Sequence, residues 1–164
     1  MYMFLVAAII MFGNISDFFI LPDSLPIILM IVSMLVWASY TDIKVNKVYQ
    51  KMCLGYAILR VAVFPLYPIS MNTVLGGVVG FLLLFLPAFL LNTSHMAGDI
   101  KFSAVLGLWM GGVPMLFGLL IGTIIFILAI LIRRKGLLGI MPFAPFISIG
   151  CFIMIMIPYL AGWR

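Results

Sequence analysis

The sequence predicts an all-α, polytopic transmembrane helix bundle, and two observations carry this prediction. Of the 164 residues, 66% are hydrophobic and only 8% are charged, whereas a typical soluble domain is about 25% charged. The apolar stretches are also continuous, as in Gly80–Leu91 and Leu116–Ile132, without the alternation typical of a membrane β-barrel. Because lipid offers the backbone no hydrogen bonds, such segments cross it as helices. We therefore expect a single integral membrane domain over residues 1–164.

The apolar segments predict about seven spans, made of one N-terminal helix and a six-helix core over residues 25–160. The segments are Tyr2–Leu21, Leu25–Thr41, Met52–Leu66, Thr73–Leu91, Ile100–Met110, Val113–Ile132 and Ile140–Leu160. The fifth is short against the roughly 20 residues that a crossing needs. No basic residue precedes the first segment and no small-residue cleavage site follows it, so we interpret it as a retained span rather than a signal peptide.

The charges predict the orientation of these spans. Seven crossings put nearly all basic residues on one side, namely Lys44, Lys47, Lys51, Lys101, Arg133, Arg134 and Lys135. By the positive-inside rule this side is the cytoplasm. We therefore expect a multi-pass protein of the cytoplasmic (inner) membrane, with the N-terminus inside and the C-terminus outside. The net charge of +5 then reflects topology and does not indicate a nucleic-acid partner. Arg60 fits neither set of loops, and we expect it to snorkel toward the cytoplasmic interface.

The acidic residues are few: four aspartates and no glutamate. Asp17 and Asp23 fall in the predicted outer loop, whereas Asp42 and Asp99 lie at the cytoplasmic ends of apolar segments. An acid near hydrocarbon is costly and is a functional candidate. Two carboxylates that share a site hold one proton between them. Such a pair suits aspartic proteolysis, in which one carboxylate activates water and the other protonates the peptide carbonyl.

A structural interpretation of the same acids stands beside the catalytic one. Asp42 follows an apolar span directly and lies two residues before Lys44, so it could simply end a helix at the interface. Asp99 could be an N-cap, because aspartate accepts hydrogen bonds from the free N–H groups of a first helical turn. The glycine pairs at four-residue spacing, such as Gly76 with Gly80, predict close helix packing. Residue types and spacing leave both interpretations open.

Three sequence blocks resemble those of the type IV prepilin peptidases, a family of intramembrane aspartic proteases of the GxGD type. Asp42-Ile43-Lys44-Val45-Asn46-Lys47-Val48 is similar to the first aspartate motif of the family. Gly98-Asp99-Ile100-Lys101, followed by the segment from Ala104 to Gly111, is similar to the second. Met141-Pro142-Phe143-Ala144-Pro145-Phe146 is similar to a third block, Pro-Phe-Gly-Pro-Phe. The blocks occur in the order of the family and cover the chain from about Leu25 to Gly150.

The resemblance implies a prepilin leader peptidase with Asp42 and Asp99 as the catalytic pair. It also implies supporting roles for Gly98, Lys101 and Lys44. The expected partner is a prepilin or pseudopilin helix with a short basic leader, and the expected chemistry needs no cofactor and no metal. The cytoplasmic insertion that larger members carry between their first two spans, often with CxxC pairs, is absent here. We therefore expect a peptidase without methyltransferase activity.

The blocks depart from the family pattern at three places. Met96 replaces the first glycine of Gly-x-Gly-Asp, Val48-Tyr49-Gln50 replaces Ile-Pro-Asn, and Ala144 replaces the glycine of the third block. If position 96 required a positive φ, methionine would be strained there. This keeps an inactive family member open as an alternative.

Two further alternatives belong to other classes. A protease of the presenilin type is disfavoured because Thr41 separates Tyr40 from Asp42 and no Pro-Ala-Leu motif occurs. A small transporter or a pilus-assembly factor without catalytic activity is disfavoured because the long spans are nearly free of polar residues.

Overall fold

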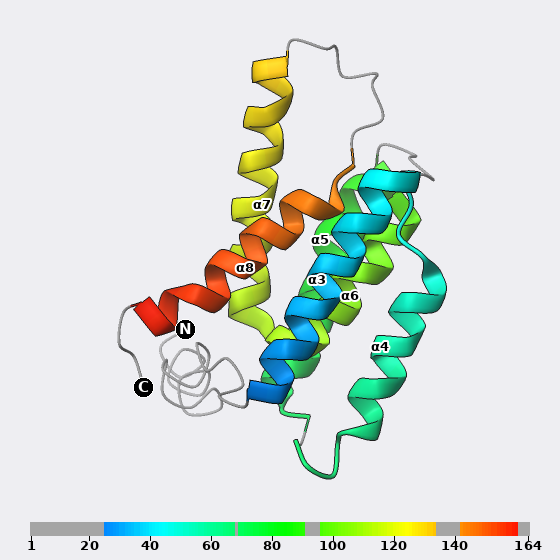
Figure 1. Ribbon diagram of the computed structural model, residues 1–164, viewed down its shortest axis with the longest axis vertical. Coiled ribbons are helices and arrows are strands. Elements are labelled where there is room, and N and C mark those ends of the chain that lie inside the picture. Colours follow the sequence, from blue (N-terminus) through cyan, green and yellow to red (C-terminus); the bar gives the residue numbers. More distant parts are fainter. Residues whose placement is uncertain (1–24, 68, 91–95, 134–141, 161–164) are drawn as a thin grey trace, which may run out of the picture.

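Six helices make up the part of the chain that the structure, a computed structural model, describes. This part covers residues 25–67, 69–90, 96–133 and 142–160, with side chains to Ile157. The helices are α3 (Leu25–Val45), α4 (Gln50–Ala62), α5 (Met71–Leu90), α6 (Ala97–Met110), α7 (Gly112–Arg133) and α8 (Ala144–Leu160), all shown in Figure 1. Every described element is thus helical, which confirms the all-α fold class. The predicted span Tyr2–Leu21 lies outside the described residues.

The helices confirm a membrane-type bundle but do not support seven spans. Among the described residues, three helices are long and apolar enough to cross a bilayer: α3, α5 and α7. The apolar part of α8, Ala144–Ile157, is shorter. With 13 and 14 residues, α4 and α6 are only about 20 Å long at 1.5 Å per residue, against a hydrocarbon core of about 30 Å.

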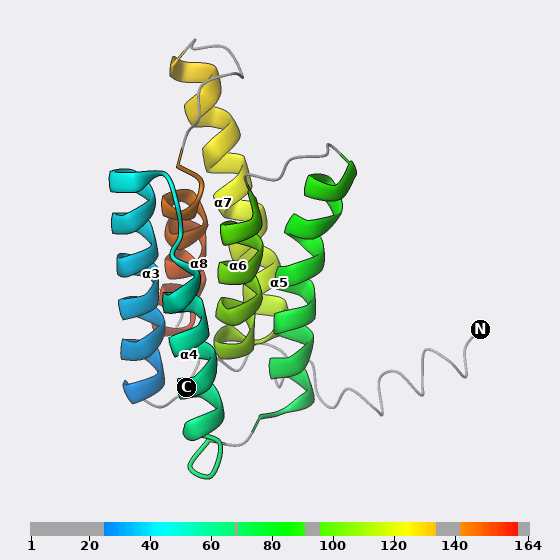
Figure 2. The same cartoon turned by 90° about the vertical axis from the view of Figure 1, so that its right-hand side faces the viewer.

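Helix α6 forms the centre of the bundle. It contacts α3, α4, α5 and α7, while α8 packs on α3 and α7. Figure 2 shows α6 flanked by α4 and α5, with α3 at the outer edge of the same row. Because α6 touches both α3 and α4, its first turn lies beside the segment that joins these two helices.

Glycines set the closeness of the α5–α6 contact. A Cβ placed on Gly76 would collide with the carbonyl oxygen of Gly107, and a Cβ on Gly107 would collide with that of Gly76. One helical turn further along α5, a Cβ on Gly80 would collide with the carbonyl oxygen of Ser103. The hydroxyl group of Ser103 donates a hydrogen bond to Gly80 O at 2.7 Å. Small residues therefore let the backbones touch, as the four-residue glycine spacing predicts.

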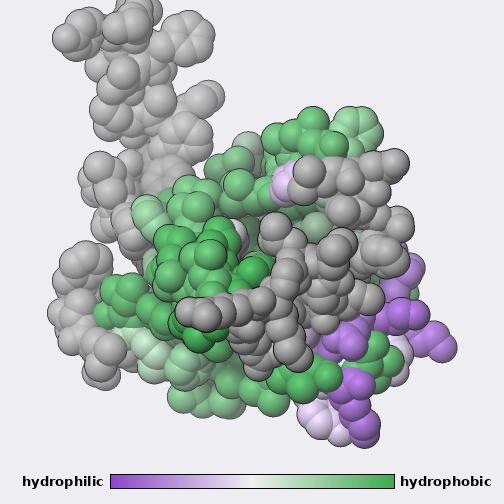
Figure 3. All heavy atoms as spheres, turned by 90° about the horizontal axis from the view of Figure 1, so that it is seen from above, coloured by the Kyte–Doolittle hydropathy of each residue, from purple (hydrophilic) through white to green (hydrophobic). Residues whose placement is uncertain are grey.

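The basic residues of the described part of the chain, except Arg60, lie toward one end of the bundle. The C-terminal ends of α3, α5 and α7 and the N-terminal ends of α4, α6 and α8 point toward this end, the top of Figure 1. Lys44, Lys47, Lys51, Lys101 and Arg133 belong to these ends, and the four lysines are exposed. Viewed onto this end, the hydrophilic surface forms a patch on one side of a mainly hydrophobic molecule (Figure 3). The exposed lysines of the described part of the chain thus lie on one side of this end of the bundle.

The prediction that Arg60 snorkels to the basic end is wrong. Arg60 is only 5% exposed. Its Nε donates to the carbonyl oxygen of Leu108 at 3.1 Å, and Nη1 donates to that of Tyr67 at 3.0 Å. Leu108 lies in the last turn of α6, where carbonyl groups lack helical partners. Arg60 therefore caps the far end of α6, an option that the sequence pattern could not reveal because it depends on packing between α4 and α6.

Candidate active site

Asp42 lies in the last turn of α3, which continues past the predicted end at Thr41. The helix stops after Val45 because Asn46 adopts a left-handed conformation, with φ of 51° and its N–H bonded to Asp42 O at 2.8 Å. Asparagine tolerates this conformation better than most residues. The Asp42 side chain is 5% exposed. The carboxyl group therefore lies inside the bundle rather than in a solvated loop.

The buried carboxylate of Asp42 binds the N-terminus of α8. The backbone N–H of Ala144 donates a hydrogen bond to Asp42 Oδ2 at 2.9 Å, and the N–H of Phe143 also stabilises the charged carboxylate. These two donors belong to the third sequence block. The structure thus brings the first and third blocks, 102 positions apart, into one site.

The local sequence explains why α8 needs a partner from another helix. Phe143 occupies the position before the helix, and its side chain has no capping oxygen. The N–H groups of Phe146 and Ile147 already bond to Phe143 O at 3.1 and 3.3 Å, and Pro145 has no N–H. Ala144 carries the remaining free donor of the first turn. Asp42 fills the role that a serine or aspartate at the N-cap usually plays.

Asp99 lies in the first turn of α6, at the same end of the bundle, just before the apolar stretch that starts at Ile100. Its side chain is partly buried. Burial and, second, the negative charge of Asp42 raise the pKa of the Asp99 carboxyl from 3.8 to about 7. The two aspartates are therefore within electrostatic reach of each other. Both aspartates lie at the same end of the bundle, where helix packing was expected to bring them together.

Gly98 lets the first two sequence blocks approach each other. A Cβ placed on Gly98 would lie 3.1 Å from the carbonyl oxygen of Val48, in the segment between α3 and α4. The φ of Gly98 is not in the left-handed region, so its need for a glycine comes from close approach alone. Gly98 thereby sets the distance between the turn that carries Asp99 and the segment that follows Asp42.

Met96 does not strain the site. It precedes α6 with φ of −84° and ψ of 2°, which any residue can adopt. The side chain is partly buried and packs against the hydrophobic core. The strain considered for a missing motif glycine therefore does not arise at this position.

The two lysines implied by the resemblance differ in what they contact. Lys101 Nζ donates to Gln50 Oε1 at 2.9 Å and so ties the first turn of α6 to the first residue of α4. Lys44 Nζ donates to Tyr40 Oη at 3.2 Å and lies 5.5 Å from the centre of the Tyr40 ring. In the described part of the chain, the hydrogen bonds of both lysines thus go to neutral side chains. Both stay near the site as exposed positive charges.

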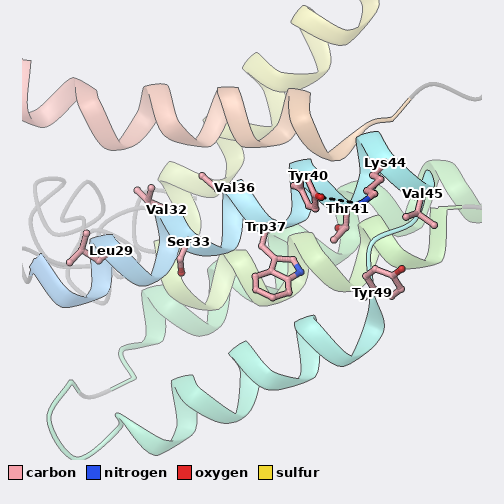
Figure 4. Close-up of a pocket in the computed structure, with 10 residues that line it drawn as sticks. All are labelled: Leu29, Val32, Ser33, Val36, Trp37, Tyr40, Thr41, Lys44, Val45 and Tyr49. Atoms are coloured by element: carbon pink, nitrogen blue, oxygen red, sulfur yellow. Dashed lines mark hydrogen bonds between the residues drawn. The ribbon is translucent and has the colours of Figure 1, made fainter.

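An open groove of about 810 Å³ runs along α3 as far as Tyr49, which precedes α4. Its walls are mainly apolar side chains such as Leu29, Val36 and Trp37, and its lining includes Thr41, the neighbour of Asp42. Figure 4 shows Trp37 pointing from α3 toward α4 and Val36 pointing away from α4, with the Tyr40–Lys44 hydrogen bond near the basic end. The groove therefore joins the apolar flank of the bundle to the turn that carries Asp42.

Sequence reasoning missed the partners that hold the site together. It assigned no role to Gln50, and it did not anticipate that the Ala144 N–H binds Asp42. The sequence did contain a signal for the helix start that supplies the Ala144 N–H, because Pro142 and Pro145 mark a helix start near residue 144. The predicted segment begins earlier, at Ile140. Among the residues that the structure does describe, no group of three His, Cys, Asp or Glu side chains could hold a metal ion.

Comparison with known proteins agrees with the resemblance seen in the three blocks. No curated protein and no solved structure shows significant similarity to the chain. The family model described as "Type IV leader peptidase family" matches residues 28–158, which include both aspartates and all three blocks. The match covers most of the chain, and it supports a membrane-embedded protease. The chain belongs to the type IV leader peptidase family.

Proposed function

We propose that this protein is a prepilin leader peptidase that uses Asp42 and Asp99 as an aspartic pair. One observation carries the proposal: at the basic end of the bundle, the negative charge of Asp42 adds to burial in raising the pKa of the Asp99 carboxyl. This pair lies in a chain of the leader peptidase family. Paired carboxylates with one shared proton are the arrangement that aspartic proteolysis needs. The site would face the cytoplasm, because the exposed lysines surround it.

The proposed reaction is hydrolysis of one peptide bond. One carboxylate takes a proton from water as the water oxygen attacks the peptide carbonyl carbon, and the other carboxyl protonates the carbonyl oxygen. The tetrahedral intermediate then collapses. The C–N bond breaks, the leaving nitrogen receives the proton taken from water, and the second carboxyl recovers its own. No metal or cofactor takes part in these steps.

The proposed substrate is a prepilin or pseudopilin, with a short basic leader followed by an apolar helix. The groove along α3 offers space for such a helix, because its walls are mainly apolar and its lining includes Thr41, the chain neighbour of Asp42, and continues to Lys44 and Tyr49. A basic leader would then meet the acidic pair, which attracts positive charge. Two structural features support activity over an inactive family member: Met96 has an unstrained backbone, and Gly98 preserves the close approach to Val48.

The test is leader cleavage by protein reconstituted in liposomes with a prepilin-type substrate. We expect Asp42→Asn and Asp99→Asn each to lower the cleavage rate by roughly 100- to 10,000-fold, the usual contribution of acid–base catalysis. Asparagine keeps a side-chain oxygen, so Asp42→Asn retains an acceptor for Ala144 N–H and the protein should still insert and fold. Asp23→Asn, the same change in an aspartate assigned to the outer loop, is the matched control. Wild-type cleavage by either site variant would overturn the proposal.

A further inference from the structure

We infer that the N-terminus of α8 divides the work of the pair: the Ala144 N–H holds Asp42 as the ionised base, and Asp99 carries the proton. The catalytic meaning of this assignment rests on the proposed function. The charge assignment itself is a property of the resting protein. It makes the third block, whose role the sequence left open, a positioning element for the first aspartate.

The hydrogen bonding of the two acids is unequal. Burial disfavours the ionised form of Asp42, as it does for Asp99. Against this cost, Asp42 Oδ2 accepts the Ala144 N–H at 2.9 Å, and the Phe143 N–H stabilises the same charge. The start of a helix also carries a partial positive charge of about half a unit, which favours an anion. Both effects stabilise the ionised carboxylate more than the neutral acid. In the described part of the chain, no donor bonds to the Asp99 carboxyl.

The charges around the pair lead to the same assignment. Once Asp42 is ionised, a second negative charge on Asp99 is disfavoured, because the two groups act on each other and like charges oppose joint ionisation. From α4, the Cys53 thiol is within electrostatic reach of Asp99 and Lys101. Lys101 on α6 and Lys44 on α3 are exposed and bonded to Gln50 and Tyr40. The first turn of α8 contains no titratable side chain.

The assignment gives each acid one task in the proposed reaction. Asp42 takes the proton from the attacking water, and Asp99 gives its proton to the peptide carbonyl oxygen. On collapse, the proton on Asp42 passes to the leaving nitrogen, and the hydroxyl formed on the carbonyl oxygen returns its proton to Asp99. Both acids regain their starting states, so no further reactant is needed.

The positioning role can be tested by removing the one N–H group. Ala144→Pro deletes the donor, and proline is tolerated in a first helical turn. Ala144→Gly keeps the donor and is the matched control. We expect the acidic limb of the kcat/KM profile to move to higher pH by about one unit in Ala144→Pro, because the Asp42 anion loses a hydrogen bond. The limb should stay at the wild-type pH in Ala144→Gly. Coinciding limbs in the two variants would overturn the inference.

A second substitution protects the test if proline at position 144 prevents folding. Lactate incorporated at this position replaces the N–H by an ester oxygen and keeps the methyl side chain. The same upward shift of the acidic limb is expected. An unchanged profile in the folded ester protein contradicts a positioning role for the N–H.

Infrared difference spectroscopy tests the charge assignment without any activity. At about pH 6, below the Asp99 pKa of about 7, we expect the carbonyl band of a protonated carboxyl to disappear in Asp99→Asn and to remain in Asp42→Asn. The reverse pattern, loss in both variants or loss in neither contradicts the assignment. If the wild type cleaves no leader, the proposed function fails and this spectrum still decides which acid holds the proton.

Discussion

Two buried charged side chains, Asp42 and Arg60, each contact the end of a neighbouring helix, at opposite ends of the bundle. Comparing them shows how a candidate catalytic site differs from a structural contact. Each is 5% exposed. Asp42 receives the N–H of Ala144 at the start of α8, and Arg60 donates to the carbonyl oxygen of Leu108 in the last turn of α6. In both cases a charge complements a helix dipole and satisfies an unpaired backbone group.

The difference lies in what else surrounds each charge. Arg60 also donates to Tyr67 O, and its guanidinium carbon lies 5.5 Å from the centre of the Trp109 ring. These are partners that cannot exchange protons with it. Asp42 has Asp99 within electrostatic reach. Burial and capping therefore do not by themselves mark a site; a second titratable group beside the buried charge does.

The strongest test of this comparison is to remove the structural charge. Arg60→Met keeps an apolar stem but leaves the partly buried carbonyl groups of Leu108 and Tyr67 without this donor. We expect the free energy of unfolding to fall by roughly 3 kcal/mol, because an unsatisfied buried polar group costs about 1–3 kcal/mol. Unfolding in detergent measures the change. Leader cleavage per folded molecule should persist, and a loss as large as that of Asp42→Asn would break the distinction.

The pair of aspartates predicts that the free energy of unfolding depends on pH through the titration of Asp99. Its pKa is about 7 in the folded protein against 3.8 as reference. The contribution of Asp99 to the free energy of unfolding is fully present below about pH 4 and declines until about pH 7. Between these pH values the unfolded chain releases a proton that the folded chain keeps. The free energy of unfolding should be lower at pH 8 than at pH 4 by roughly 4 kcal/mol.

Asp99→Asn provides the control for this pH dependence, because asparagine does not titrate. The variant should lose most of the decline between pH 4 and pH 7. Arg60→Met, in contrast, should lower stability at both pH values and leave the decline in place. An equal decline in wild type and Asp99→Asn would show that other groups cause it.

The geometry of the candidate active site can be disturbed without changing its charged residues. Gly98→Val places a branched side chain against the carbonyl oxygen of Val48, which lies 3.1 Å from a Cβ at this position. Displacing the Asp99 turn should lower kcat by roughly tenfold or more, since small misplacements at a catalytic group are costly. Gly98→Ala should have a smaller effect. Gly55→Val is a control for loss of a helical glycine, because a Cβ at Gly55 meets no atom within 4 Å.

The smallest effect is expected where the sequence departs from the family motif. Met96→Gly restores the motif glycine, but Met96 already has an ordinary φ of −84°. We expect a change in the free energy of unfolding of roughly 1 kcal/mol or less, from lost packing and added backbone freedom. Cleavage should change by less than about tenfold. A large gain in activity would show that position 96 needs glycine for a reason other than its φ.

The composition and the continuous apolar segments by themselves determined the helical class and the approximate bounds of six helices. This worked because long apolar segments have one stable solution in lipid. The ends were less predictable. Helix α3 runs to Val45 because Asn46 can turn left-handed, and α8 begins at Ala144, after Pro142 and Phe143.

The short motifs named Asp42, Gly98 and Asp99, but only the tertiary structure decided what surrounds them. Asp42 meets a backbone N–H 102 positions away, Gly98 faces Val48, and Arg60 turns inward to Leu108 instead of outward to the interface. Each of these contacts satisfies a polar group or allows a close approach between helices that are distant in the chain. Residue identity and spacing along one helix carry no information about such partners, because the partners are set by how the helices pack.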